Sequence, residues 1–494
     1  MKILLLAAEV VPFVKTGGLA DVTGSLPPAI RELGHDIRVA MPRYGRIRPD
    51  RFPITPVPGS FPVPMDSHTE PAELMQATLG NDVPVYLVEN AHYFDRDGIY
   101  MYPDDAERFV FFCRGAMEGM RHLGCPPAVI PCHAWHTALV PNWLTTVYAN
   151  DPFFADTASV YPIHSLGYRG IFGHRVLEIA GIAEYEFVAR PEGTDANQVV
   201  DFMSRGIGYA DVINTVSPTY AREILTPEYG EQMDSLLRSR RERLFGILNG
   251  IDVDEFNPAA DPHLDTSYTV ETLDLRPRDK LALQQETGLH QDVQTPVVGI
   301  IARLVDQKGF DLIAPMVEPM LQHLGIQFVL LGTGEQRYHE FFLDLARRYP
   351  HQAGVFLTFN ASLSHRIYAG ADIFLMPSRF EPCGLGQMIA MRYGSVPLVR
   401  AVGGLADTVS DYDPATDQGT GFVFESYEAM SLYTTMVRAV ETYRHREIWR
   451  RLQARCMQQD FSWQTSAKKY AELYARASRL RAQERPDSPG QAGE

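Results

Sequence analysis

The chain has 494 residues, and its 45 Lys and Arg against 61 Asp and Glu give a formal net charge of −16. Hydrophobic residues make up 45% of the chain and charged residues 21%, a globular composition that excludes a largely disordered protein. The negative charge argues against a general binder of nucleic acid or anionic membranes, because it does not attract phosphate. At about 100–200 residues per domain, the length predicts two or three domains.

The cysteine content points to a reducing compartment. There are 5 cysteines, an odd number, and no CxxC pair, so we expect free thiols and a cytoplasmic location. No apolar run approaches the length of a membrane span, so no membrane association is expected. The N-terminus faintly resembles a signal peptide, but Glu9 interrupts its apolar stretch and no convincing cleavage site follows. A buried first strand is therefore the favoured interpretation.

The first half of the chain alternates short apolar runs with helical patterns. The predicted strands are residues 2–11, 36–41, 84–88, 158–163 and 211–216. After residues 2–11 comes a glycine loop and then a helical pattern that reaches Gly34, in which Pro27 and Pro28 should produce a kink or start a new turn. Strands that alternate with helices in this way predict an α/β fold with a parallel sheet.

A second series of the same kind begins near residue 297, after a connecting segment at 248–262. Its predicted strands are residues 297–302, 328–332, 355–359, 372–377 and 396–399. Two such series predict two doubly wound domains, whose ligands bind beyond the carboxyl ends of the strands. A last helical pattern covers about residues 463–483 and precedes a polar tail.

One sequence, GGLAD, occurs twice, at residues 17–21 and 403–407. A glycine pair before a helical pattern exposes backbone N–H groups to an anion, although two unrelated tight turns are the alternative. Lys15 precedes the first pair, where its ammonium can neutralise a phosphate above Gly17 and Gly18. A solvated lysine in a loop is the other interpretation.

Two further segments follow predicted strands of the second series. Arg303 and Lys308 come after residues 297–302, at the ligand side of the sheet, where two cations suit a leaving diphosphate. A basic turn with a surface ion pair is the alternative. Glu381 lies in the segment after residues 372–377, next to a glycine-rich helix start. Such a carboxylate can hydrogen-bond sugar hydroxyls, or it can simply favour the helix dipole.

The histidines of the first half offer a weaker signal. Cys132, His133 and His136 could suggest zinc, but no second ligand pair occurs at the usual spacing, so packing or substrate binding is favoured and no metal is expected. His164 follows the predicted strand 158–163, a position that favours a functional role as much as a structural one.

Taken together and in this order, four segments resemble the bacterial glycogen synthases and plant starch synthases. They are KTGGLADV (15–22), ILNGID (247–252), RLVDQKGF (303–310) and SRFEPCGL (378–385). The resemblance extends over about residues 1–480. Position 389 is Ile, whereas a related group of sugar transferases carries a second glutamate there, and this difference favours the synthase branch.

The resemblance implies a GT-B fold, which consists of two Rossmann-like doubly wound domains that face a deep interdomain cleft. The expected division is an acceptor-side domain at 1–246, a nucleotide-sugar-binding domain at 247–462, a helix at 463–485 that crosses back to the first domain, and a flexible tail at 486–494. The implied activity is transfer of glucose from ADP-glucose to the non-reducing end of an α-1,4-glucan, with retention of configuration. UDP-glucose remains an alternative donor.

The resemblance also assigns site residues by position. The catalytic set is Glu381, Arg303, Lys308 and His164. The donor-binding set is Lys15, Gly17, Gly18, Asp21, Asn249, Cys383, Gly384 and Leu385. In the family, arginine and lysine side chains neutralise the leaving diphosphate and the glutamate faces the donor sugar. The family requires neither a metal nor another cofactor.

Two segments on the acceptor side depart from the family pattern. At residues 131–137 the family has HCHDWHT, and this chain has Ala134 in place of the catalytic-centre aspartate. Loss of such a carboxylate commonly lowers the rate by a few powers of ten. The family's HNLAYQG segment is also altered around His164. The leading hypothesis is therefore an α-glucan synthase. The alternatives are a catalytically impaired paralogue that binds nucleotide sugar or glucan, and a related transferase with a different acceptor.

Overall fold

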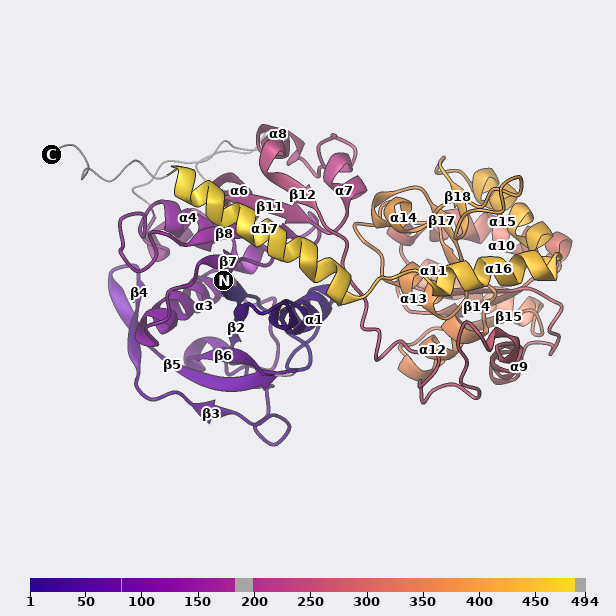
Figure 1. Cartoon of the computed structure of the whole chain (residues 1–494), viewed down its shortest axis with the longest axis horizontal. Coiled ribbons are helices and arrows are strands. Elements are labelled where there is room, and N and C mark those ends of the chain that lie inside the picture. The colour runs from indigo at the N-terminus through magenta and orange to yellow at the C-terminus, as the bar shows by residue number, and fades with distance from the viewer. Residues whose placement is uncertain (81, 183–198, 485–494) are drawn as a thin grey trace. The chain divides into compact units, whose positions relative to one another are not determined.

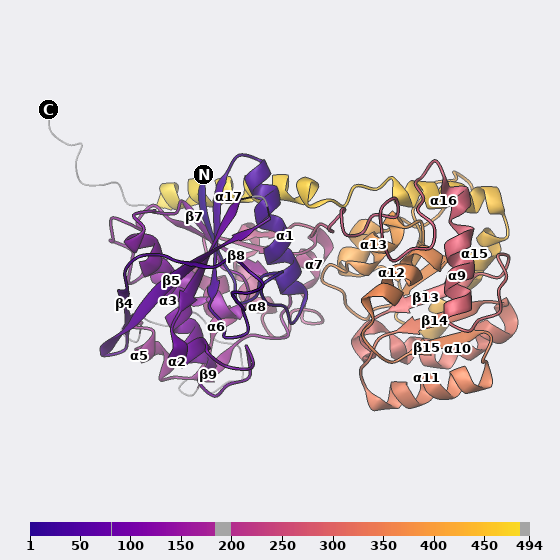
Figure 2. The ribbon, with the colours of Figure 1, turned by 90° about the horizontal axis from the view of Figure 1, so that it is seen from below.

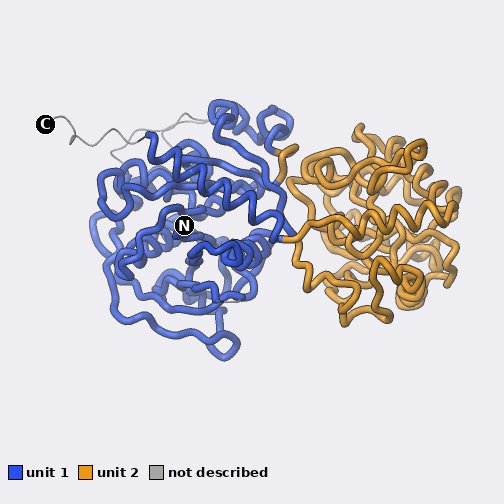
Figure 3. Tube along the Cα trace, viewed as in Figure 1, with its two compact units in different colours: residues 1–216, 221–250, 463–494 blue, residues 217–220, 251–462 orange. Residues whose placement is uncertain are grey.

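The computed structural model describes residues 1–80, 82–182 and 199–484. Within this part the chain forms two compact units, drawn in blue and orange in Figure 3. Unit 1 comprises residues 1–216, 221–250 and the C-terminal segment from 463, and unit 2 comprises residues 217–220 and 251–462. The predicted flexible tail at 486–494 lies outside the described residues. No helix in the described ranges is long and apolar enough to cross a membrane.

Unit 1 is built, in the residues described, on a ten-stranded sheet (Figure 1). The parallel strands are β1 (Lys2–Leu6), β2 (Asp36–Pro42), β6 (Val83–Glu89), β7 (Val129–Pro131), β8 (Ala158–Ile163), β11 (Val212–Thr215) and β12 (Leu244–Gly246). The antiparallel strands at one edge are β3 (Thr55–Pro56), β4 (Phe61–Met65) and β5 (His68–Leu79). Strands β9 (Ile171–Gly173) and β10 (Val199–Asp201) pair separately.

The helices of unit 1 connect and cover these strands. They are α1 (Gly18–Glu32), α2 (Ala91–Phe94), α3 (Asp105–His122), α4 (Leu139–Thr145), α5 (Val176–Ile179), α6 (Phe202–Tyr209), α8 (Asp234–Ser239) and α17 (Trp463–Glu484), while α7 (Pro218–Glu223) begins in unit 2 and ends in unit 1. The last helix, yellow in Figure 1, packs on α1 and β8. The C-terminal helix therefore belongs to the same unit as the first strand.

Unit 2 contains a six-stranded sheet in which all pairs are parallel. Its strands are β13 (Val297–Ile301), β14 (Gln327–Leu331), β15 (Ala353–Phe356), β16 (Ile373–Met376), β17 (Val396–Arg400) and β18 (Phe422–Phe424). Its helices are α9 (Pro277–Glu286), α10 (Phe310–Leu324), α11 (Gln336–Arg348), α12 (Ala361–Gly370), α13 (Gly386–Arg392), α14 (Gly403–Thr408), α15 (Ala429–Tyr443) and α16 (Arg446–Met457). Figure 2 shows strands β13 to β15 between α12 on one side and α11 on the other.

The strand order of each sheet creates a topological switch point. In unit 2 the order is β15-β14-β13-β16-β17-β18, so the chain builds outward from β13 on one side and then returns to β16 on the other. In unit 1 the chain likewise builds from β1 through β2 and β6, then returns to β7 beside β1. In open α/β sheets of this kind, ligands bind beyond the carboxyl ends of the strands at such positions.

Most predicted strands are confirmed, with differences of one or two residues at their ends. The first strand is shorter than predicted, because β1 ends at Leu6 and residues 7–10 continue as a buried loop. Of the two effects expected of Pro27 and Pro28, the start of a new turn is wrong, because α1 runs through both prolines to Glu32. Leu26, Pro27 and Ile30 are buried, and burial of this apolar face compensates for the missing N–H donors.

Candidate active site

In unit 1 a buried carboxylate supports the glycine loop that follows β1. Glu9 is 3% exposed, and its Oε2 accepts hydrogen bonds from the backbone N–H groups of Thr16 and, at 3.2 Å, of Gly17. Its Oε1 accepts a 2.6 Å hydrogen bond from the hydroxyl of Tyr100. The loop is thus held from inside the unit by a charged acceptor.

The outer side of this loop is open. A Cβ placed on Gly17 or on Gly18 has no heavy atom within 4 Å, apart from its chain neighbours. Helix α1 begins at Gly18, and its N-cap residue Gly17 provides no side-chain cap. The uncapped N–H groups of a first helical turn form an anion-binding position, and the absence of side chains lets a ligand approach the backbone.

Lys15 lies beside this helix start. Its Nζ donates to Oδ1 of Asp21 at 2.7 Å, and the two side chains are 55% and 35% exposed. An ion pair this exposed contributes little stability, so its lysine can exchange the carboxylate for a phosphate at low cost. The structure therefore brings together four of the predicted donor-binding residues, namely Lys15, Gly17, Gly18 and Asp21.

A pair of histidines follows the next two strands of the same sheet. His133 comes after β7 and His164 after β8, and His133 Nδ1 lies 2.9 Å from His164 Nε2. Burial lowers the pKa of His133 well below its usual range, and burial also lowers the pKa of His164 to about 4. Both imidazoles are therefore neutral at neutral pH, and one ring donates a hydrogen bond to the other.

His136 belongs to the same neighbourhood but not to a metal site. Its ring stacks on Tyr100 with centroids 4.8 Å apart, and burial, assisted by the charge of Arg108, lowers its pKa to about 3. Across the described ranges, no group of three or more His, Cys, Asp or Glu side chains is placed to hold a metal ion.

Ala134 has an unusual backbone conformation between these histidines. Its φ is 62° and its ψ is −178°, a region that costs residues other than glycine of order 1–3 kcal/mol. Thr137 holds this turn, since its N–H and its hydroxyl donate to the carbonyl of Ala134 and the hydroxyl also donates to that of His133. The replaced aspartate position is therefore a strained backbone position next to the histidine pair.

In unit 2 the centre of the candidate site is a buried ion pair. Lys308 Nζ lies 2.5 Å from Oε2 of Glu381, and the same oxygen accepts a 3.0 Å hydrogen bond from the hydroxyl of Ser378. Glu381 is 6% exposed. Lys308 follows β13 and Glu381 follows β16, the two paired strands at the switch point. These residues, 73 positions apart, therefore meet at the carboxyl edge of the sheet.

A glycine makes this meeting possible. Gly309 follows Lys308 directly, has φ 79°, and approaches Pro377 so closely that a Cβ would overlap its carbonyl oxygen. Only glycine combines the left-handed conformation with this approach. Arg303, one of the predicted catalytic residues, lies earlier in the same connection, exposed and without an ion-pair partner among the residues described.

The segment from Cys383 to Leu385 precedes α13 and is fixed by a buried amide. Gln387 is fully buried, and its Nε2 donates to the carbonyl oxygens of Gly384 at 2.9 Å and of Cys383 at 3.2 Å. Gly384 has φ 71°, so this turn too requires glycine. The predicted residues Cys383, Gly384 and Leu385 are thus adjacent to Glu381 and held in one conformation.

The two copies of GGLAD have different surroundings and therefore different structural roles. In the second copy a Cβ on Gly403 would overlap the carbonyl oxygen of Glu381, and one on Gly404 would overlap that of Cys383. The glycines of residues 403–404 are therefore packing residues that support the Glu381 segment, whereas those at 17–18 face open space. The aspartates differ too, since Asp407 accepts hydrogen bonds from Ser217 and Thr219.

Asn249 is separated from the other predicted donor-binding residues of the second half. It lies in unit 1, is 7% exposed, and its Oδ1 has no hydrogen-bond partner within the described residues. The next residue, Gly250, packs against the backbone of Trp463 at the start of α17.

Sequence reasoning missed several members of these clusters. The sequence could have indicated a role for Glu9, because a carboxylate inside an apolar run is unusual and needs hydrogen-bond partners when it is buried. Ser378 lay inside a recognised segment but had no assigned role. Tyr100 is 91 residues from Glu9, and no local pattern connects the two.

The comparisons with known proteins agree along the whole chain. Residues 2–239 match the starch synthase catalytic domain family, and residues 285–453 match glycosyl transferases group 1. The glycogen synthase of Desulforudis audaxviator is 46% identical over 500 residues, with 98% of both chains covered. That of Moorella thermoacetica is 47% identical over 481 residues, with 97% of both covered. The catalytic domain of starch synthase IV from Arabidopsis thaliana, bound to ADP and acarbose, has a TM-score of 0.87 at 34% identity and covers 97% of this chain and 99% of that one.

Proposed function

This chain belongs to the family of glycogen and starch synthases and is a glucosyltransferase with the GT-B fold; from that premise we propose that it transfers glucose from ADP-glucose to the non-reducing end of an α-1,4-glucan. We further propose that the anomeric configuration is retained. The starch synthase structure bound to ADP and acarbose supports an adenine nucleotide and a glucan as the two ligands.

The Lys308–Glu381 pair at the switch point of unit 2 is the observation that carries the donor assignment. We propose that Lys308 and Arg303 neutralise the diphosphate of the donor, which gains negative charge as it leaves. Glu381 then accepts hydrogen bonds from hydroxyls of the donor glucose. Cys383, Gly384 and Leu385 contribute backbone groups to the same ligand.

In the proposed reaction the bond between C1 of glucose and the distal phosphate oxygen breaks. The acceptor hydroxyl oxygen forms the new bond to C1 on the same face, and its proton passes to the departing phosphate oxygen. The products are ADP and a glucan longer by one residue. The contribution of the chain is positioning and electrostatic stabilisation, and no step requires a metal ion or another cofactor.

Unit 1 contributes the second set of residues in this proposal. Lys15 and the N–H groups beside Gly17 and Gly18 contact donor phosphate, and Asp21 releases Lys15 for that purpose. His164 acts as a neutral hydrogen-bond donor to the transferred sugar, because its pKa of about 4 keeps it uncharged while His133 fixes its ring. Asn249 offers its unpartnered buried amide oxygen to a ligand hydroxyl.

The test is nucleotide release from ADP-glucose and from UDP-glucose, each with a malto-oligosaccharide acceptor. We expect faster turnover with ADP-glucose and an acceptor that grows at its non-reducing end. Lys308→Met should lower kcat/KM by about 100-fold or more, the usual effect of removing one preorganised charge. Arg347→Gln is the matched control, since Arg347 is 76% exposed in unit 2 and pairs only weakly with Asp344.

Two results contradict the proposal in different ways. If neither donor releases nucleotide, the chain is not an active glucosyltransferase with this acceptor. If Lys308→Met and Arg347→Gln have the same activity as the original chain, transfer occurs but the Lys308–Glu381 pair is not its donor site.

We also propose a cytoplasmic location. The five cysteines, at positions 113, 125, 132, 383 and 456, are buried, and none of them forms a disulfide in the described residues. Burial raises the pKa of Cys113 and Cys132, which makes both thiols unreactive. Cysteines that form no disulfide suit a reducing compartment, where a nucleotide sugar is also available.

A further inference from the structure

Unit 2 contains a cavity at the edge of its sheet that is opposite to the edge with Lys308 and Glu381. The cavity has a volume of about 310 Å³ and lies where α9 and α16 begin. One of its lining residues, Asp372, directly precedes β16, and its Oδ2 accepts a 2.9 Å hydrogen bond from the N–H of Val297, the first residue of β13. The cavity is therefore at the amino ends of the two strands whose carboxyl ends carry Lys308 and Glu381. At about 3.3 Å per residue, a five-residue strand separates the two edges by about 15 Å.

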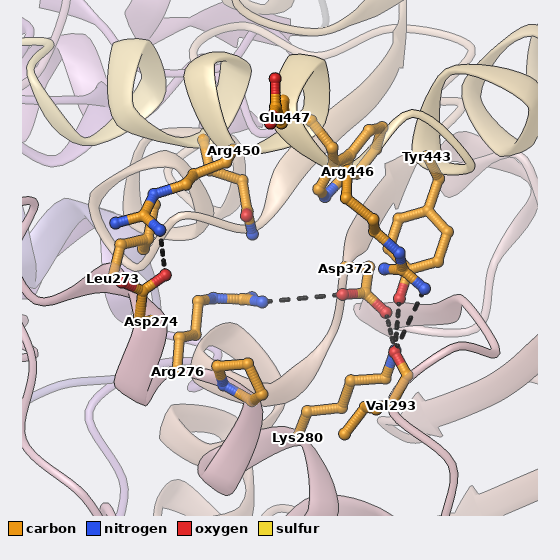
Figure 4. Close-up of a pocket in the computed structure, with 13 residues that line it drawn as sticks. Leu273, Asp274, Arg276, Lys280, Val293, Asp372, Tyr443, Arg446, Glu447 and Arg450 are labelled. Carbon is orange, nitrogen blue, oxygen red and sulfur yellow. Dashed lines mark hydrogen bonds and ion pairs between the residues drawn. The ribbon is translucent and has the colours of Figure 1, made fainter.

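Positive charge is in excess inside this cavity. Figure 4 shows Arg276 and Lys280 reaching Asp372 from one wall and Arg446 entering from another. Lys280 Nζ lies 2.7 Å from Asp372, and Arg276 lies 3.7 Å from the same carboxylate. The basic lining residues are Arg276, Lys280, Arg446 and Arg450 and the acidic ones are Asp274, Asp372 and Glu447, which leaves one positive charge in excess. Burial lowers the pKa of Lys280, and the nearby charges of Arg446 and Arg276 act in the same direction, as expected where positive charge is not fully balanced.

Arg446 is the cation whose charge is least compensated. Its guanidinium donates to the carbonyl oxygen of Gln294 at 3.0 Å and to the side-chain oxygen of Gln294 at 2.7 Å, and it lies 4.0 Å from the centre of the Tyr443 ring. All of these partners are neutral, and the ranges that the structure describes contain no carboxylate within ion-pair distance of Arg446. An arginine stacked on an aromatic ring keeps its in-plane N–H groups available for a planar or tetrahedral anion.

The lining of the cavity also includes a tryptophan whose buried indole N–H has no hydrogen-bond acceptor among the described residues. Trp449 lines it and is 2% exposed, and its indole Nε1 has no hydrogen-bond acceptor among the described residues. A buried N–H group without a partner costs about 1–3 kcal/mol, so native structures rarely keep one unless another molecule satisfies it. The ring of Trp449 therefore borders the cavity, and an anionic oxygen there would accept hydrogen bonds from Arg446.

The surroundings of the cavity favour a phosphate group with an organic body. Helices α9 and α16, of 10 and 12 residues, both begin at its wall and add the positive ends of their dipoles. Arg450 stands at the rim, paired with the exposed Asp274. Leu273 and Pro277 add apolar surface to the same lining. A volume of about 310 Å³ exceeds that of an inorganic ion and falls within the range of small-metabolite pockets.

We propose that this cavity is a binding site for a small phosphomonoester, separate from the catalytic edge of unit 2. Its phosphate contacts Arg446 and Arg450, and its organic part packs against Leu273, Pro277 and the ring of Trp449. Because β13 and β16 run from this cavity to the Lys308–Glu381 pair, an occupied cavity borders the same two strands that carry the donor residues. The site does not depend on which nucleotide sugar the enzyme uses.

The probes are inorganic phosphate and phenyl phosphate, and phenol is the uncharged control. We expect calorimetric titration of the full chain to give one site that binds phenyl phosphate at least fivefold more tightly than inorganic phosphate, with no binding of phenol. The fluorescence of Trp449 should change on binding, and Trp449→Phe should abolish that change. Arg446→Gln should weaken phenyl phosphate binding by about tenfold or more, as expected for loss of a charged hydrogen bond.

Arg444→Gln is the matched control, because Arg444 precedes the same helix but is 62% exposed and pairs with Glu441 outside the cavity. Arg303→Gln tests the other edge, since a phosphate bound at the donor site would depend on Arg303. Weakening by Arg446→Gln but by neither of the other two supports the proposal. Weakening by Arg303→Gln alone, equal affinity for phosphate and phenyl phosphate, or no binding at all would overturn it.

Discussion

Lys308 Nζ and Glu381 Oε2 lie 2.5 Å apart, and each of the two residues follows one of the two central strands of the second sheet. Glu381 is almost fully buried, and Ser378 donates to the same oxygen as Lys308. A buried ion pair of this kind leaves each partner without compensation if the other is removed. In the proposed donor site, Lys308 must therefore be shared between Glu381 and the phosphate, or move from one to the other.

Glu381→Gln tests this sharing. The substitution keeps the shape of the side chain but removes the charge, and it leaves Lys308 uncompensated in a poorly hydrated position. We expect kcat to fall by about 100-fold or more, because the amide is a weaker acceptor for the donor sugar. Ser378→Ala removes only a neutral hydrogen bond to the same oxygen and should cost tenfold or less. Steady-state kinetics with ADP-glucose compares the two, and similar losses would contradict a charge-specific role.

Glu9 should matter for both stability and donor affinity. Glu9→Ala removes the acceptor of the Thr16 and Gly17 N–H groups and of the Tyr100 hydroxyl. A hydrogen bond contributes about 1 kcal/mol net, so we expect the loss of all three to lower the free energy of unfolding by about 3 kcal/mol and to raise KM for the donor. Urea denaturation and kinetics measure these effects. Tyr100→Phe, which removes one of the three contacts, should produce a smaller change in stability, and an equal change would exclude the loop contacts as the main contribution.

The two glycine pairs should respond differently to alanine. Gly18→Ala meets no neighbouring atom, so stability should change by about 0.5 kcal/mol or less while KM for the donor increases. Gly404→Ala places a Cβ against the carbonyl oxygen of Cys383 and should lower the unfolding free energy by about 1–3 kcal/mol. Thermal denaturation distinguishes them. A large loss of stability in Gly18→Ala would show that the outer side of the first loop is not open.

Two substitutions of Ala134 distinguish the effect of backbone strain from the effect of the missing carboxylate. Ala134→Gly relieves the positive φ and should raise the unfolding free energy by about 1 kcal/mol without raising kcat. Ala134→Asp restores the family residue next to His133. We expect it to raise kcat by tenfold or more if a carboxylate at this position assists transfer. Unchanged kcat in Ala134→Asp would mean that another group performs that role in this chain.

The His133–His164 pair predicts an acid-sensitive fold. The folded-state pKa of His164 is about 4, below the usual value of 6.5, so the unfolded chain binds more protons between these values. Stability from this group is complete above about pH 6.5 and is lost as the pH falls towards 4, by of order 2 kcal/mol. Urea denaturation at several pH values between 4.5 and 7.5 measures the slope. His164→Gln should flatten it, and an unchanged slope would assign the effect to other groups.

The sequence by itself determined the fold class and predicted which residues bind the donor. Continuous apolar runs such as residues 36–41 and 297–302 are buried on both faces of a parallel sheet, so they are recognisable without knowledge of their neighbours. The segments around Lys15, Lys308 and Glu381 are local, because a turn that follows a strand is encoded by its own glycines and charges. Strand β5, which lies at an edge and alternates in burial, was missed because its polar positions interrupt the apolar signal.

Tertiary structure alone decided which of these residues meet. Strand order brings Lys308 to Glu381 across 73 residues and Glu9 to Tyr100 across 91, and no local pattern encodes either contact. It also gave identical GGLAD sequences different roles, since what surrounds a glycine depends on distant backbone. The cavity around Arg446 has the same origin: its basic residues come from the start of α9 and the start of α16, and only packing brings these two segments together. Burial and long-range pairing are properties of the folded chain, and they decide which charges act together.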